Sequence, residues 1–401
     1  MRIIVLNCYS RMGLAVTNAL DPSYDLIGGH GDQGIPGVRG FERRLKSPRL
    51  REIFRYPEPH KDEAGFHEAI LDACRRYEAD GVFPASSGTA VGLSRLKQRA
   101  RGEVAARFVV EDYDTLVRLA DKWGLHQLAV ELGVPSPRTV LPAGDGVAEL
   151  AELRLPVVAK PRMAEASTGI LFIDSREELD AFVADPPRVG SQVEGYPYIV
   201  QQVEPGEIHC ASGCWQAGRV VSLSSNHRVL TRHEFGGQGI VHHLTDEPEI
   251  MEYAERMLGH VGWSGPAQLE FIRDPAGRYH LLDCNVRVWG STELVVAAGM
   301  NVCQQAVDVM VSGRELERQR EYVVGMAAKW WTLGSVARCF RSPRTPDAIA
   351  RRLRLLLARS PGGGTVSNLR RGNFRHLAGI VVDTSQGRRR RARARKARGS
   401  S

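Results

Sequence analysis

The residues best suited to chemistry lie at the ends of two neighbouring apolar stretches. Glu270 is near the end of the first stretch, and Asp283, Asn285 and Arg287 alternate at the end of the second. Side chains of a strand alternate in direction, so these last three are expected on one face. The Pro- and Gly-containing turn at 274–277 predicts a hairpin that brings Glu270 alongside them.

Two carboxylates and an amide oxygen form a set of hard oxygen ligands, which favours Mg²⁺ over zinc. An arginine beside a cation site makes sense if a polyanion bridges the two, as a transferring phosphoryl group does. The alternative is a surface strand with salt-bridged charges. The residues of this stretch alone leave both interpretations open.

Lys160 leaves the apolar stretch 156–159, where a lysine is costly unless it meets an anion or solvent. Ser167, Thr168 and Gly169 follow, and small residues let backbone N–H groups approach phosphate oxygens closely. The Gly-Lys-Ser/Thr pattern of the P-loop is absent here. The alternative is a solvent-facing lysine before a surface loop.

Strands and helices alternate at the start of the chain. Strands are expected at 2–7 and 80–85, and helices at 12–20 and 63–78, which predicts a parallel α/β domain. A Gly-x-Gly-x-x-Gly pattern does not follow the first strand, so a dinucleotide site there is weakly supported.

Further along the chain, residues 112–133 have a helical pattern, and short apolar strands are expected from 155 to 221. A helix is expected at 247–261. The hairpin strands are expected at 267–272 and 279–283.

The net charge of +8 is a property of the C-terminal tail. Eight basic residues between Arg388 and Arg398 account for all of it. Residues 346–358 are expected to form a helix that carries arginines beside leucines. Tail and helix together raise an alternative class of function, docking on anionic lipid or nucleic acid. The seven cysteines show no Cys-x-x-Cys pair, which favours free thiols in a reducing compartment.

The order of these motifs resembles that of the ATP-grasp ligases, closest to the carbamoyl phosphate synthetase-like branch, which includes many carboxylate–amine ligases. The resemblance covers about residues 1–315. The matching segments are Asp121-Lys122 opening a helix that ends in Gly133-Val134-Pro135, the segment Pro156–Pro161 with its Ser-Thr-Gly loop, the hinge-like segment 200–207, and Gln268–Phe271 with Asp283–Ser291.

The resemblance implies roles for individual residues. Lys122 and Lys160 would contact ATP phosphates beneath the loop of Ser167, Thr168 and Gly169. The further roles are as follows: Gln201, Gln202 and Val203 lining the adenine, Glu207 accepting from the ribose hydroxyls, Glu270, Asp283 and Asn285 holding Mg²⁺, and Arg287 with Arg228 stabilising phosphoryl transfer.

Two departures from the family pattern concern the metal site. Asp283 stands where a glutamate is usual, a shorter ligand that should shift the metal. Val286 replaces the proline of the usual Asn-Pro-Arg and keeps the alternation.

The implied fold is α/β with an α+β catalytic core. An N-terminal parallel α/β pre-ATP-grasp domain at 1–111 precedes a two-subdomain ATP-grasp domain at 112–315. The finer boundaries are a small subdomain with lid at 112–205, a catalytic subdomain at 206–315, a C-terminal extension at 316–385 and a basic disordered tail at 386–401.

The implied reaction is ATP-dependent joining of a small carboxylate to an amine through an acyl phosphate, releasing ADP and phosphate. The cofactors would be ATP and two Mg²⁺ ions, which Mn²⁺ could replace. We expect a cytoplasmic enzyme that needs no nucleic acid or membrane partner, with self-association left open. The alternatives are a different acceptor, such as a thiol, phosphorylation of an enol, or tail-mediated binding to an anionic surface with a vestigial ATP site.

The histidines 209, 227, 233, 242 and 243 suggest a metal site, but we do not expect one. His242 and His243 are adjacent, so on a strand they face opposite ways. One of the five, with Arg228 and Arg232, could instead line the acceptor pocket. Trp330-Trp331 is more typical of a core or an interface than of ligand stacking.

Overall fold

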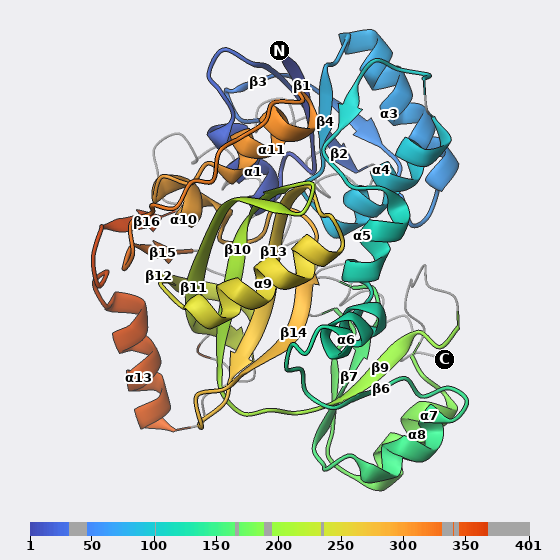
Figure 1. Ribbon diagram of the computed structural model, residues 1–401, viewed down its shortest axis with the longest axis vertical. Coiled ribbons are helices and arrows are strands. Elements are labelled where there is room, and N and C mark those ends of the chain that lie inside the picture. The colour runs from blue at the N-terminus through green and yellow to red at the C-terminus, as the bar shows by residue number, and fades with distance from the viewer. Residues whose placement is uncertain are drawn as a thin grey trace, which may run out of the picture.

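The computed structural model describes residues 1–31, 46–100, 102–164, 168–187, 195–233, 236–330, 340 and 345–367, with side chains of 232–238 left aside. Ser167 and the basic tail lie outside these residues. Three sheets organise the chain (Figure 1).

The N-terminal sheet is parallel and has the strand order β3-β2-β1-β4-β5. Its strands are β1 (Arg2–Leu6), β2 (Asp25–Gly31), β3 (Leu50–Tyr56), β4 (Gly81–Phe83) and β5 (Arg107–Phe108), with helices α1 (Arg11–Ala19), α3 (Glu63–Tyr77) and α4 (Ser87–Arg99). The predicted parallel α/β arrangement is confirmed. Fully buried Ile4 and Val5 explain the apolar start of the chain, since a central parallel strand is covered on both faces.

The stretch predicted as one helical region, 112–133, consists of α5 (Tyr113–Ala120) and α6 (Lys122–Glu131). Asp121 separates them with an extended backbone, and its side chain accepts a hydrogen bond from the Trp123 amide. Such a cap satisfies a backbone donor that the first turn leaves free. Lys122 therefore begins α6.

A small antiparallel sheet has the order β6-β9-β7-β8. Its elements are β6 (Thr139–Val140), α7 (Gly146–Glu149), a 3₁₀ turn (Leu150–Glu152), β7 (Val157–Pro161), β8 (Leu171–Ile173), α8 (Arg176–Ala184) and β9 (Tyr198–Gln202). This sheet has its own core around Val157, Leu179 and Tyr198. It lies with α7 and α8 at the opposite end of the molecule from the N-terminal sheet (Figure 1).

The central sheet has the order β14-β13-β10-β11-β12-β15-β16 and is antiparallel except between β15 and β16. Its strands are β10 (Glu207–Gln216), β11 (Arg219–His233), β12 (Gly236–Thr245), β13 (Gly265–Arg273), β14 (Tyr279–Asn285), β15 (Ala327–Lys329) and β16 (Thr365–Ser367). The strands β15 and β16 lie in the segment 316–385, which was expected to be a C-terminal extension. Part of that segment therefore belongs to the central sheet.

Helices cover both faces of the central sheet. Ala254 and Met257 of α9 (Pro248–His260) pack with Trp215 and Leu269 on one face (Figure 1). On the other face, α10 (Thr292–Ala297) and α11 (Val302–Met310) belong to a core that continues into β1 of the N-terminal sheet. This shared core fixes the N-terminal sheet against the central one.

The amphipathic helix predicted at 346–358 is α13 (Pro346–Leu357), where Leu356 is buried and Leu353 and Leu357 are exposed. Within the residues described, no helix combines the length and apolar character that crossing a membrane requires.

Candidate active site

The two carboxylates meet across the β13–β14 hairpin. In its register Glu270 lies opposite Asp283, and Gln268 lies opposite Asn285. The Asn285 amide donates to Glu270 Oε1 at 3.0 Å and to Gln268 Oε1 at 3.3 Å. The predicted approach of Glu270 to Asp283 and Asn285 is confirmed by this register, and we refer to the three residues as the acid cluster.

Arg228 reaches this cluster from β11. Its Nη2 atom lies 2.7 Å from Glu270 Oε1, and the two side chains are only 10% and 18% exposed. Burial by itself raises the pKa of Glu270, but Arg228 outweighs it and the pKa falls below its ordinary value. Glu270 is therefore held as a carboxylate, the form that a metal ion requires.

Lys122 approaches the cluster from the first turn of α6. Its Nζ atom lies 3.3 Å from Asp283 Oδ1 and donates to the Ala164 carbonyl at 3.2 Å. Asp121, the cap of α6, also accepts from Arg162 Nε at 2.9 Å, just beyond β7. The cap thus links the start of α6 to the end of the Lys160 strand.

Lys160 approaches from β7 and donates to Gln201 Oε1 at 2.5 Å. Burial lowers the pKa of this lysine to about 8, with a further contribution from Lys122, while Asp283 and Glu270 act in the opposite sense. A bound anion would strongly stabilise the charged ammonium form of such a buried lysine. Two lysines and two carboxylates from four different elements thus converge.

The hinge-like segment 200–207 begins within β9, beside Lys160. Gln201 is buried and donates to Thr139 Oγ1 at 2.8 Å, so it connects Lys160 to β6. The Gln202 amide oxygen faces Arg154, at 2.7 and 2.9 Å from its nitrogens. Val203 is the first residue after β9, in the connection to β10.

The loop between β7 and β8 carries the predicted phosphate-binding residues. Thr168 is exposed, and Gly169 has a φ of 74°, a conformation that favours glycine. Ser167 lies outside the described residues, so its placement stays a prediction.

Arg287 follows the end of β14 and contacts the N-terminal domain. Its Nε atom donates to Ser87 Oγ at 3.0 Å, and Nη1 donates to the Val288 carbonyl at 2.6 Å. The side chain is buried, and its charge also acts on Glu270. Sequence reasoning missed Ser87, because nothing local marks a serine 200 positions away as a partner.

Arg11, the first residue of α1, was also missed. Its guanidinium lies 4.0 Å from the Trp330 ring centroid, and its Nη1 donates to the Gly239 carbonyl at 3.5 Å. Burial lowers the pKa of Arg11 to about 10, against the attraction of Glu293 and with the repulsion of Arg228. An arginine directly after the first buried strand was the available signal. Trp330 is buried, as expected of a core residue.

The model of the family described as "ATP-grasp in the biosynthetic pathway with Ter operon" matches residues 220–332. This segment runs from β11 through the acid pair to the strand β15. Over this segment the chain is similar to that ATP-grasp family. The mixed α/β architecture of the chain, with a parallel N-terminal sheet, agrees with the fold predicted from the sequence.

Curated relatives match part of the chain. A D-alanine–D-alanine ligase of Pseudomonas entomophila is 27% identical over 177 residues, which are 41% of this chain and 54% of that enzyme. The chain therefore spans about half the length of these ligases. Pyruvate carboxylase 1 of Caenorhabditis elegans is 23% identical over 241 residues, 55% of this chain and 20% of that protein.

Two solved structures show the same fold. The biotin carboxylase domain of 2-oxoglutarate carboxylase from Hydrogenobacter thermophilus matches with a TM-score of 0.61 at 15% identity, over 80% of this chain and 72% of that chain. An L-amino acid ligase from Bacillus licheniformis matches with a TM-score of 0.57 at 15% identity, over 77% and 73%. The fold is thus shared by carboxylases and ligases, and does not by itself distinguish them.

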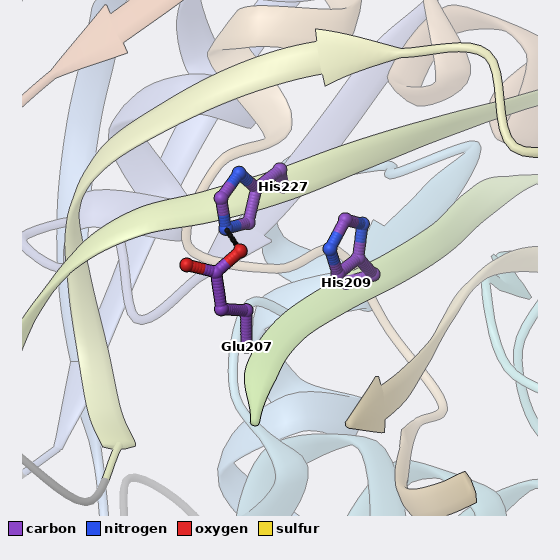
Figure 2. Close-up of side chains that lie close together, drawn as sticks. All are labelled: Glu207, His209 and His227. Carbon is purple, nitrogen blue, oxygen red and sulfur yellow. Dashed lines mark ion pairs between the residues drawn. The ribbon is translucent and has the colours of Figure 1, made fainter. Parts of the chain in front are cut away.

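The remaining predicted residue of the ATP-grasp site, Glu207, is the first residue of β10. Its Oε2 atom lies 3.4 Å from Nε2 of His227, and it is 60% exposed (Figure 2). Alternation along β10 puts Glu207 and His209 on one face and Cys210 on the other, where Arg228 Nη2 lies 3.8 Å from the Cys210 sulfur. The predicted ribose contact therefore stays a prediction.

The segment predicted to lie on the substrate side includes Arg232 and Gly236-Gly237. The side chains of residues 232–238 are not among those described, so this segment is placed only in part. His242 is buried on β12, and Asn226 lies 3.4 Å from its Nδ1. Burial, then the charges of Arg228 and Arg11, lower the pKa of His242 well below its ordinary value. His242 is consequently neutral at physiological pH.

Proposed function

We propose that this protein is an ATP-dependent ligase that activates a carboxylate as an acyl phosphate and transfers the acyl group to an amine. The observation that carries the proposal is the convergence of Glu270 and Asp283 with Lys122, Lys160 and Arg228. Cations around an oxygen-rich cluster suit a polyphosphate held through divalent metal ions.

The donor set fits Mg²⁺. Glu270, Asp283 and Asn285 offer two carboxylates and an amide oxygen, and Glu270 is ionised in the free protein. We infer that these three hold two Mg²⁺ ions, for which Mn²⁺ can substitute. The metal, when bound, neutralises charge on the β- and γ-phosphoryl oxygens.

The nucleotide would lie between the small sheet and the central sheet. Lys122 and Lys160 would contact its phosphates, with Ser167, Thr168 and Gly169 of the β7–β8 loop above them. Gln201, Gln202 and Val203 would line the adenine. Lys160 is held by Gln201 in the free protein, so nucleotide binding would exchange a neutral acceptor for an anionic one.

In the proposed reaction a carboxylate oxygen attacks the γ-phosphorus, the bond to the β–γ bridging oxygen breaks, and ADP leaves. The amine nitrogen then attacks the acyl carbon. Phosphate departs with one oxygen of the original carboxylate, and the amine proton passes to solvent. Arg228 and Arg287 would stabilise the charge that develops on the phosphoryl and acyl oxygens.

A small carboxylate and an amine are the substrates we infer, in the cytoplasm where ATP is supplied, with a homo-oligomer compatible with this activity. The test is a screen of amino acids and small carboxylates for substrate-dependent ADP release, with coupled products identified by mass spectrometry. Amide products with ADP support the proposal. A thioester, a stable phosphorylated product or a carboxylated product would show that the acceptor is not an amine and would contradict the proposal.

A further inference from the structure

A second cluster of metal-ligating groups lies on the opposite face of β10 from Cys210. Glu207, His209 and His227 each place one ligand atom within 4.8 Å of the others (Figure 2). His209 and His227 are directly paired across β10 and β11, and their rings stack with centroids 4.5 Å apart and planes 7° apart. The sheet register itself holds the two imidazoles together.

The buried side chain of His209 lacks hydrogen-bond partners among the described residues. Its side chain is 5% exposed, yet neither ring nitrogen makes a hydrogen bond within the part of the chain that the structure describes. A buried polar group without a partner costs free energy and calls for an explanation. Glu207, at 60% exposed, opens the cluster to solvent on its other side. Glu207, and His227 at 22% exposed, are thus the members of the cluster that face solvent.

We propose that Glu207, His209 and His227 bind a divalent transition-metal ion of the zinc class. Two imidazoles and a carboxylate with an open position are a known zinc donor set, at about 2.0–2.2 Å from the metal. Tetrahedral ligands at that distance are about 3.4 Å apart. The ligand atoms now lie within 4.8 Å of one another, and because the two rings are stacked with planes 7° apart, both imidazoles must turn for their nitrogens to meet at one ion.

A carboxylate stands behind His209 and would complete an outer shell for the ion once the ring moves within hydrogen-bond distance. Glu247 Oε1 lies 3.7 Å from His209 Nδ1, and Tyr279 donates to the other Glu247 oxygen at 2.9 Å. A carboxylate behind a histidine orients the ring and strengthens it as a ligand. Two carboxylates, Glu207 and Glu247, therefore lie beside the two histidines, and Arg273 is a cation close enough for its charge to act on both.

The site is separate from the Mg²⁺ cluster, because it uses the other face of β10. It lies where the connection 203–206 enters the central sheet from β9. A bound ion would link the first residues of β10 to β11. The ion would thus restrain the connection between the small sheet and the central sheet, beside the hinge residues.

The test is Zn²⁺ binding to the full chain in buffer containing excess Mg²⁺, measured by competition with a chromophoric chelator. We expect one Zn²⁺ per chain, and at least a tenfold loss of affinity in Glu207→Gln and in His227→Gln. Co²⁺ in place of Zn²⁺ should show tetrahedral absorption bands that both variants lose. His260→Gln is the matched control, an exposed histidine on α9 that contacts Glu131 at 3.3 Å.

Failure of Zn²⁺ to bind above the level of a Mg²⁺-only control would overturn the site, as would equal affinity in both variants and the parent. Titration with ADP distinguishes the ribose alternative. Weaker ADP binding by Glu207→Gln with unchanged Zn²⁺ binding assigns Glu207 to the nucleotide and contradicts the metal site. None of these readouts depends on ligase activity.

Discussion

Replacing Arg228 with methionine removes the ion-pair partner of a buried carboxylate. Arg228 and Glu270 are 10% and 18% exposed and 2.7 Å apart. Breaking such a pair by removing one partner costs about 3–5 kcal/mol, because the remaining charge is left uncompensated. We expect Arg228→Met to lower the free energy of unfolding by about that amount in metal-free buffer.

The assay is urea denaturation without Mg²⁺, followed by tryptophan fluorescence, to which the buried tryptophans 215, 263, 289 and 330 contribute. Arg256→Met is the control, because its partner Glu252 is 70% exposed and such surface pairs contribute about 0.2–1 kcal/mol. The double variant Arg228→Met with Glu270→Gln should recover much of the loss, since the unpaired charge is gone. Mg²⁺ with ADP should also stabilise Arg228→Met more than the parent.

Two results would refute this reasoning. One is a loss in Arg228→Met no larger than in Arg256→Met. The other is strict additivity in the double variant, within about 0.5 kcal/mol, which would show that the two residues are not coupled.

Three further predictions concern the site and the tail. Asp283→Ala or Arg287→Ala should abolish substrate-dependent ADP release while circular dichroism shows a folded chain, and full activity in either would contradict the assignment. Burial lowers the pKa of Lys160 from 10.5 in the unfolded chain to about 8 in the folded protein. Between these two pH values the unfolded chain binds a proton that the folded protein has lost, so the stability that this group contributes rises with pH through that window. The phosphates of bound ADP should restore the ammonium form of Lys160, so ADP binding at pH 8.5 should be accompanied by uptake of a proton. Calorimetry in buffers of different ionisation enthalpy measures this uptake, and Lys160→Met should abolish it. Truncation after Gly387 should leave ADP release unchanged, and a salt-sensitive loss of binding to anionic vesicles would instead favour the anionic-surface alternative.

Local pattern was sufficient for the hairpin of the site. Alternation along 279–285 and the turn at 274–277 placed Glu270 beside Asp283, as the β13–β14 register confirms. The helix start at Lys122 could also be predicted. Each of these features depends on residues within one hairpin or one helical turn, where sequence spacing determines geometry.

Contacts between distant segments could not be predicted in the same way. The Arg228–Glu270 pair joins residues 42 positions apart, and Ser87 meets Arg287 across 200 positions. Strand β16 joins the sheet through pairing with β15 across 38 positions of chain. Such pairings follow from packing of whole layers, which no single window of sequence contains. The break at Asp121 was expected only from the resemblance to the ATP-grasp ligases, since the helical pattern over 112–133 runs across it.

The central claim is that a carboxylate oxygen receives the γ-phosphoryl group. The most direct measurement uses a carboxylate substrate, found by the ADP-release screen, with both oxygens labelled with ¹⁸O. An acyl phosphate predicts ADP as the nucleotide product and one ¹⁸O atom in each phosphate released, read by mass spectrometry. Unlabelled phosphate, or ¹⁸O in AMP, would contradict the proposed mechanism.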